Sequence, residues 1–427
     1  MLRYTLLNNG WRIVSGPLIL ILIPTYLTNI DQGYWYLFFA LTTIFAIADM
    51  GVSQLILQYT AQAARTVKYE NGSITGDDDD KDMLSYIFIK TERHLRIYGN
   101  LVLAIIFVIG IAFLVKNGNS DLYYIAAWVI YVLAAYMNFK NYYFSNFIEG
   151  LHFIQLSQRM KLVSSIASTV ITASLLASGF GIYALSVGMF TSSMILSFYY
   201  RINFIKAFRA FAASHPSPLN FELAAFDTLT KRYIVSFISG YLIFNSFVPV
   251  SNLVASPEFS GKVGLSLALA IAIFSLSNSF IQVKIPSINS HIASNQVDLA
   301  RSMFTKSLSI GCFFYVASVM IFVIIFAFVK HPAIDKLESR MLPLTAFISL
   351  LACYGLQLLI NSYATFVRAF NIEPFMIGSV MLAAWVPASS FIATYSNHSE
   401  YIFSGWLASF ALWLPYTIYS YKQKTIR

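Results

Sequence analysis

The sequence is poor in charge. Of its 427 residues, 11% are charged, whereas 58% are hydrophobic and 16% are aromatic. Soluble globular domains carry roughly 25% charged residues, so a chain of this length with so few cannot cover its surface in water. In a soluble protein the net charge of +9 would suggest nucleic-acid binding. In a membrane protein the first question is on which side of the membrane the positive charges lie. We predict a polytopic membrane protein with no nucleic-acid partner.

The residues on which much enzyme chemistry depends are also scarce. Only two cysteines occur, Cys312 and Cys353, and both lie in apolar runs, which excludes a disulfide framework. The six histidines are scattered without metal-ligand spacing, and no phosphate-binding loop of the Walker A type is present. We therefore predict no catalytic residues, no metal and no cofactor, and ATP is not the direct energy source.

Long apolar runs fill most of the chain. A helix that spans a bilayer needs about 20 mostly apolar residues, so the length allows about twelve spans. The runs between helix breakers predict an all-α protein with spans near 13–30, 34–61, 97–116, 121–144, 160–179, 182–200, 233–254, 263–283, 307–329, 342–363, 374–394 and 401–421.

Lysine and arginine are distributed unevenly between the two sides of these spans. If the N-terminus is inside, 22 of them lie on the cytoplasmic side and 5 on the other side, with Lys140 near the inner end of the fourth span. Cytoplasmic loops carry the excess of positive charge in membrane proteins. We predict that both termini are cytoplasmic. The predicted external loops are too short to hold the catalytic residues of a membrane glycosyltransferase or polymerase.

Two longer segments are predicted on the cytoplasmic side. The first, 66–96, contains the acidic run Asp77–Asp80, which lacks the alternating spacing of a calcium loop and is predicted to be a solvated, mobile loop. The second, 201–232, contains two amphipathic pieces that we expect at the membrane interface. The apolar face of the first piece consists of Ile202, Ile205, Phe208 and Ala212, and that of the second of Leu219, Leu223, Phe226 and Thr230.

A short internal repeat supports two halves. The first span contains Ser15-Gly16-Pro17-Leu18-Ile19, and the seventh contains Ser239-Gly240-Tyr241-Leu242-Ile243, each with a further proline nine or ten residues after the serine. Six spans in each half keep the same orientation, so the repeat is parallel. The predicted domains are an N-terminal six-helix lobe 1–200, a cytoplasmic linker 201–232 and a C-terminal six-helix lobe 233–427.

The second span and three short features identify a related family. The span reads GYWYLFFALTTIFAIADMGVSQLILQYTAQAA, with Asp49-x-Gly51 in its inner half. Glu149-Gly150 follows the fourth span, and Pro286 follows the eighth, before a loop that reaches Arg301. With these features and its length, the chain resembles the polysaccharide exporters of the multidrug/oligosaccharidyl-lipid/polysaccharide superfamily, in particular the O-antigen-type lipid-linked oligosaccharide flippases.

The resemblance implies a fold and a function. Such a protein has two six-helix lobes around a central cavity and works by alternating access. It moves undecaprenyl-diphosphate-linked oligosaccharide across the bacterial inner membrane for surface polysaccharide biosynthesis, as a monomer, with a polysaccharide polymerase and a chain-length regulator as partners. A cation-coupled drug exporter of the same superfamily and an integral-membrane transferase are the alternatives.

Three cations near the inner ends of spans are candidates for the substrate's diphosphate. Lys140 follows a long apolar run and has polar neighbours, so its ammonium either snorkels to the interface or faces a wet cavity. Arg12 and Arg368 face the same choice. The guanidinium of arginine can bind phosphate through two parallel hydrogen bonds, whereas the ammonium of lysine acts as a point charge. We predict that Arg12, Lys140 and Arg368 form the headgroup site.

Amides recur at helical spacing in two spans. Gln357 and Asn361 lie on one face of the tenth span, and Gln54 and Gln58 lie on one face of the second. Amides inside a membrane form hydrogen bonds between helices or line a polar cavity, and both interpretations remain open.

Asp49 is the only acidic residue well inside a predicted span. A buried carboxylate can take up a proton and couple transport to a gradient. It can equally serve as a helix cap or salt bridge, so both roles remain open.

Overall fold

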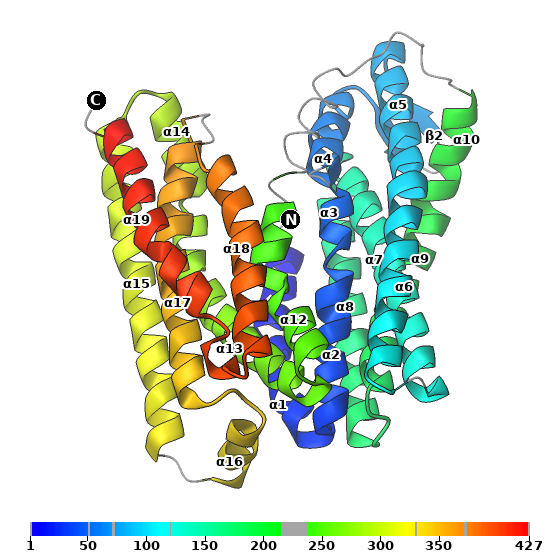
Figure 1. Ribbon diagram of the computed structural model, residues 1–427. Coiled ribbons are helices and arrows are strands. Elements are labelled where there is room, and N and C mark those ends of the chain that lie inside the picture. Colours follow the sequence, from blue (N-terminus) through cyan, green and yellow to red (C-terminus); the bar gives the residue numbers. More distant parts are fainter. Residues whose placement is uncertain are drawn as a thin grey trace. The chain divides into compact units, whose positions relative to one another are not determined.

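The computed structural model is composed mainly of helices and divides into two compact units, Met1–Phe237 and Ile238–Arg427. In each unit the helices run roughly side by side as a bundle (Figure 1). The structure describes residues 2–49, 52–70, 73–119, 121–214, 235, 238–328, 331–370 and 374–425. The second amphipathic piece predicted in the linker lies outside these residues.

The N-terminal unit contains most of the short elements. Its elements are α1 (Leu2–Tyr26), α2 (Asn29–Thr42), α3 (Phe45–Asp49), α4 (Val52–Ala63), β1 (Lys68–Glu70), β2 (Ser73–Thr75), α5 (Asp78–His94), the π-helical turn η1 (Leu95–Gly99), α6 (Asn100–Lys116), α7 (Leu122–Gly150), α8 (Ile154–Ala177), α9 (Tyr183–Tyr200), the π-helical turn η2 (Arg201–Ile205) and α10 (Lys206–Ser214).

The C-terminal unit begins with a helical segment over 238–245. Its further elements are α12 (Phe247–Val254), α13 (Pro257–Gln282), α14 (Ile285–Ala293), α15 (Val297–Phe328), α16 (Pro332–Ser339), α17 (Leu344–Arg368), α18 (Met376–Tyr395), the short 3-10 helix η3 (Ser399–Tyr401) and α19 (Ser404–Thr425).

Many of the helices are long and apolar enough to cross a bilayer. Within the described residues, seven meet this condition by length and composition. They are Asp78–Lys116, Leu122–Gly150, Ile154–Ala177, Pro257–Ile292, Val297–Phe326, Leu344–Arg368 and Met376–Tyr395. The chain is therefore a multi-pass, all-α membrane protein, as its composition predicts.

The second predicted span, 34–61, is not one continuous helix. The helix breaks after Thr42, where α2 ends, and helical structure resumes at Phe45 in α3. The hydroxyl of Thr42 donates to the carbonyl of Phe38 (2.9 Å), and that of Thr43 donates to the carbonyl of Ala40 (2.6 Å). Such hydroxyls compete with the backbone for helical carbonyls and bend helices. The apolar run thus predicted helical structure here but missed its interruption.

The predicted mobile loop at the acidic run is wrong. Asp78 to Asp80 form the first turn of α5, which continues through η1 into α6. Carboxylates at a helix N-terminus interact favourably with the exposed N–H groups and the helix dipole. The ammonium of Lys81 also lies 2.9 Å from the Asp78 carboxylate, at helical i, i+3 spacing. The run therefore starts a helix.

A two-stranded hairpin that the sequence analysis did not predict anchors α10. β1 and β2 pair antiparallel, with Tyr69 opposite Ile74. The hydroxyl of Tyr69 donates to the carbonyl of Asn203 (2.5 Å), and its ring lies 5.2 Å from that of Phe208 between centroids. Burial raises the pKa of Tyr69 above its ordinary value, which keeps this hydroxyl a donor.

The first amphipathic piece, 201–212, continues α9 as one helical run. Phe208 is completely buried, and its ring lies 5.9 Å from that of Phe88 in α5 and 5.0 Å from that of Phe147 in α7. Ile202 of the predicted apolar face is instead 50% exposed. The buried aromatic contacts fix α10 against α5 and α7.

Candidate functional site

Lys140 lies on α7 over the face of an aromatic ring. Its Nζ is 4.2 Å from the centroid of the Tyr136 ring, one helical turn earlier, which is a cation–π distance. The hydroxyl of Tyr136 donates to the side-chain oxygen of Asn100, the first residue of α6. The ammonium is therefore held beside a polar group of the neighbouring helix.

Lys140 lines a cavity of about 230 Å³. We call it the cation pocket, and its lining residues are Glu92, Leu95, Arg96, Asn100, Tyr136, Lys140, Phe144 and Arg209. They come from α5, η1, α6, α7 and α10. All five elements belong to the N-terminal unit.

Two stripes of side chains with a spacing of four residues form most of the cation pocket. One stripe runs along α5, η1 and α6, and the other runs along α7. Residues four apart lie on the same face of a helix. The π-helical turn η1 lies within the first stripe, and such turns occur often at functional sites. The first stripe is Glu92, Arg96 and Asn100, and the second is Tyr136, Lys140 and Phe144.

The cation pocket carries an excess of positive charge. Three cationic side chains line it, together with one carboxylate, that of Glu92. Arg209 contacts this carboxylate, with Nε 2.7 Å and Nη2 2.6 Å from Oε1. In the part of the chain that the structure describes, Lys140 and Arg96 have no carboxylate within ion-pair distance. Two of the three cations are therefore not paired with a carboxylate among the described residues.

The other two predicted cations lie on other helices. Arg12 lies in the middle of α1, in the N-terminal unit. Arg368 is the last residue of α17, in the C-terminal unit, where it is exposed and its Cζ lies 5.8 Å from the centroid of the Phe375 ring. A joint site of Arg12, Lys140 and Arg368 stays a prediction.

The predicted polar stripes differ in their surroundings. Asn361 of α17 donates to the side chain of Asn278 in α13 (3.3 Å), which is an interhelical hydrogen bond. Gln357 is half-buried one turn earlier on the same helix. Gln58 is exposed on α4, and Gln54 lies on α4 one turn before it. A role of these amides in a cavity wall stays a prediction.

Asp49 of α3 contacts Ser53 of α4. Its carboxylate accepts from the backbone N–H of Ser53 (3.1 Å) and from the Ser53 hydroxyl (2.9 Å). The carboxylate thus bonds to both the backbone and the side chain of a residue four positions later. This geometry fits the structural role, and ion coupling by Asp49 stays a prediction.

Glu149, at the inner end of the fourth predicted span, organises a second polar cluster. Its Oε1 accepts from the ammonium of Lys161 (2.7 Å), the hydroxyl of Ser157 (2.8 Å) and the amide of Gln158 (3.2 Å). Asn8 of α1 donates to the Gln158 carbonyl oxygen (3.0 Å). The carboxylate therefore links α7 to α8 and, through Gln158, to α1.

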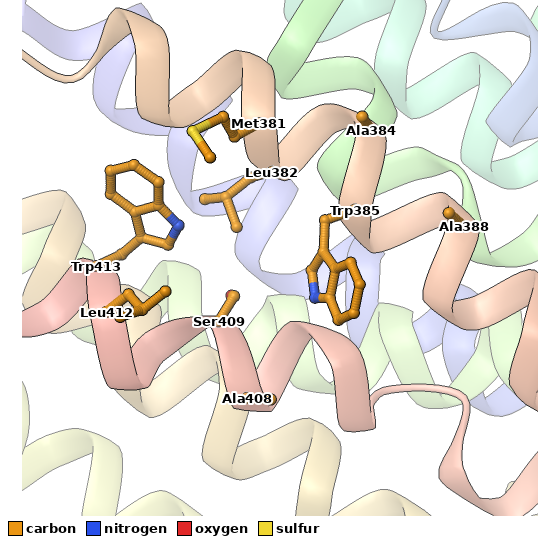
Figure 2. A pocket seen from close by; sticks show the side chains of 9 residues that line it. All are labelled: Met381, Leu382, Ala384, Trp385, Ala388, Ala408, Ser409, Leu412 and Trp413. Carbon is orange, nitrogen blue, oxygen red and sulfur yellow. The ribbon is translucent and has the colours of Figure 1, made fainter.

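A larger cavity, of about 710 Å³, lies between α18 and α19 in the C-terminal unit. Figure 2 shows the indole rings of Trp385 and Trp413 on either side of Leu382. The Trp385 N–H donates to the carbonyl of Gly405 (2.8 Å), and the Ser409 hydroxyl donates to that of Trp406 (2.6 Å). The N–H of Trp385 and the hydroxyl of Ser409 are thus hydrogen-bonded to backbone carbonyls, and the cavity is apolar.

The sequence pattern pointed to Lys140 but not to the two other cations of the cation pocket. Arg96 could have been found from its spacing of four residues from Asn100 at the start of the third span. Arg209 carried no such signal, because its partner Glu92 lies 117 positions earlier in the chain. Neither tryptophan of the apolar cavity was singled out, since aromatic residues are abundant throughout the chain.

Comparison with known proteins finds the fold but no sequence family. No family model and no curated protein matches the chain. Among solved structures, a multidrug resistance MATE family transporter of the MOP superfamily, in an inward-facing conformation, superposes with a TM-score of 0.58 at 12% identity. The match covers 98% of this chain and 94% of that one.

Two further structures match at a TM-score of 0.50. One is a MATE transporter in complex with MaL6, at 13% identity, with 96% of each chain covered. The other is a MOP superfamily transporter from Pyrococcus furiosus with a binding pocket of reverse polarity, at 14% identity, with 97% of this chain and 95% of that one covered. The predicted fold class, about twelve membrane helices in two lobes, is thus confirmed, and the chain has the fold of MOP superfamily transporters.

Proposed function

We propose that this protein is a membrane exporter whose substrate is an anionic lipid-linked oligosaccharide, moved from the cytoplasmic to the outer leaflet of a bacterial inner membrane. The observation that carries the proposal is the charge of the cation pocket. Lys140 and Arg96 have no carboxylate partner among the described residues, and a third cation, Arg209, lines the same cavity. A diphosphate carries two or more negative charges and many acceptor oxygens, which suits such a site.

The chemistry of these side chains favours an anion over a cation. Hydrogen bonds between charged donors and phosphate oxygens contribute about 1.5–3 kcal/mol each. A cationic drug would instead meet like charges and would have to displace Arg209 from the single carboxylate, Glu92. The aromatic rings of Tyr136 and Phe144, which also line the cavity, offer flat apolar faces beside the phosphate site.

A drug exporter of the same superfamily is the second candidate, and the apolar cavity favours it. The rings of Trp385 and Trp413 provide large aromatic faces, and such faces attract organic cations as well as neutral apolar molecules. The reverse polarity described for the binding pocket of the Pyrococcus furiosus transporter indicates that pocket charge varies within this fold. Pocket charge therefore separates the two candidates.

The deciding experiment compares three ligands on the purified protein in a nonionic detergent. Farnesyl diphosphate carries an isoprenoid and a diphosphate, farnesol carries only the isoprenoid, and tetraphenylphosphonium is an apolar cation. We expect farnesyl diphosphate to raise the unfolding temperature saturably, because a ligand that binds the folded state stabilises it. Stabilisation by tetraphenylphosphonium alone would contradict the proposal and favour the drug exporter.

The proposed substrate also places the protein in a surface-polysaccharide system. A polymerase and a chain-length regulator would then act on the translocated product. In a strain that lacks its own oligosaccharide flippase, we expect this chain to restore surface glycan. Restored drug resistance without glycan would contradict the proposal.

A further inference from the structure

Arg209 and Glu92 differ in how freely they can move. In their ion pair, the Arg209 side chain is 59% exposed and the Glu92 side chain is 21% exposed. Both contacting nitrogens of Arg209 approach the same carboxylate oxygen, Oε1. An exposed arginine on a long flexible stem can leave this carboxylate at small cost in burial, whereas Glu92 is more enclosed.

The backbone below Arg209 is fixed. Its neighbour Phe208 is completely buried and contacts the rings of Phe88 and Phe147. A change in the position of the guanidinium therefore requires only rotation of the Arg209 side chain, while α10 stays in place. Such a rotation can transfer Arg209 from Glu92 to a ligand, and α10 keeps its contacts with α5 and α7.

The three cations of the cation pocket are not equivalent. Lys140 and Arg96 face the cavity without a carboxylate partner among the described residues, whereas Arg209 already has one. An arriving diphosphate can use the first two directly. To form hydrogen bonds with the Arg209 guanidinium as well, the diphosphate must break the ion pair between Arg209 and Glu92. It then lies near the negative charge of Glu92.

We infer that Glu92 competes with the ligand for Arg209 and so limits how tightly the cation pocket holds a diphosphate. The inference rests on the proposed function, which assigns a diphosphate to this cavity. A carrier has to release its substrate as well as bind it, and a built-in competing carboxylate lowers affinity without removing any cation. Glu92 is thus a release residue that acts through Arg209.

The competition makes two substitutions act in opposite directions. Glu92→Gln keeps the shape and a hydrogen-bond acceptor but removes the competing charge, so Arg209 becomes available to the ligand. Arg209→Gln removes the arginine fork from the ligand. For farnesyl diphosphate measured by titration calorimetry, we expect about tenfold tighter binding with Glu92→Gln and about three- to tenfold weaker binding with Arg209→Gln.

The double variant tests the coupling between the two residues. With Arg209 absent only the direct repulsion between Glu92 and the diphosphate remains, so we expect Glu92→Gln to tighten binding by less in the Arg209→Gln chain than in the unmodified chain, and an equal gain in both chains would overturn the inference. Asp79→Asn is a matched control, because it removes an exposed carboxylate on the same helix outside the cation pocket. All variants are compared at one salt concentration, and their unfolding temperatures are recorded.

The outcomes separate this inference from the proposed function. If Glu92 and Arg209 only brace α5 against α10, both single variants lose stability and bind more weakly, which overturns the inference. Unchanged affinity in Glu92→Gln, with saturable binding to the unmodified chain, also overturns the inference but leaves the diphosphate site intact. Absence of saturable farnesyl diphosphate binding in every chain overturns the assignment of a diphosphate to the cation pocket.

Discussion

Replacing Lys140 by methionine removes the ammonium and keeps most of its apolar stem. The stem can still pack against Tyr136, whose ring centroid lies 4.2 Å from the ammonium nitrogen. Lys140→Arg keeps the charge and adds further donors. This pair of variants therefore separates the charge at position 140 from the packing of the side chain.

The size of the effect depends on the surroundings of Lys140. A lysine ammonium has three N–H donors, so it can remain over the Tyr136 ring while it donates to a phosphate. The cation–π contact then exists with and without ligand and cancels in the binding comparison. The net loss in Lys140→Met is one charge-assisted hydrogen bond, about 1.5–3 kcal/mol, or about ten- to a hundredfold in affinity.

The assay is restoration of surface glycan in a strain that lacks its oligosaccharide flippase. We expect Lys140→Met to reach the membrane at normal abundance but to lose most of the glycan, and Lys140→Arg to retain much of it. Binding of farnesyl diphosphate by the purified variants should follow the same order. Abundance in the membrane fraction controls for failure to fold.

Normal glycan with Lys140→Met would refute this reasoning. It would show that the ammonium only snorkels to the interface, as a lysine near the end of a span can. Equal loss of glycan in Lys140→Met and Lys140→Arg, at normal abundance, would show that a positive charge at position 140 is not sufficient and that the exact shape of the side chain matters.

Three further predictions concern the stability of the protein and its orientation in the membrane. Gly110→Leu should lower the free energy of unfolding by about 1–3 kcal/mol, because any Cβ there would overlap the buried indole of Trp128, and scanning fluorimetry would record it. Glu149→Gln should lower it by about 3 kcal/mol, because Lys161 loses its charged partner, and Lys161→Met in the same chain should recover part of this loss. Single cysteines placed at either terminus should be labelled only from the cytoplasmic side, and external labelling of either would contradict the predicted orientation.

Composition was sufficient to predict the fold class. Only 11% of the residues are charged, and apolar runs of span length recur along the chain, which leaves a multi-pass helical membrane protein as the physically available outcome. Interruptions within a span were not predicted, because hydropathy averages over many residues. The break after Thr42 depends on two hydroxyls that donate to backbone carbonyls. The residues around them are apolar, so the averaged hydropathy stays high and gives no sign of the break.

The site was only partly predictable, for a related reason. Lys140 stood out because a charge at the end of an apolar run is expensive unless it has a function or reaches water. Arg209 did not stand out, because an arginine in an amphipathic segment between predicted spans is ordinary. Its position beside Glu92 depends on Phe208, which is buried between α5 and α7 and brings the two residues together across the fold.

The acidic run shows how one local signal can be interpreted in two opposite ways. Four consecutive aspartates repel one another and favour a solvated loop, but a helix N-terminus offers unpaired N–H groups that carboxylates stabilise. The apolar residues after the run decide between these two outcomes. Leu84, Ile87 and Phe88 are buried in the unit, and Phe88 packs on Phe208, so tertiary contacts offset the cost of ordering the whole helix. The same packed helix then presents Glu92 to Arg209, which makes the cation pocket dependent on a segment that looks disordered in the sequence.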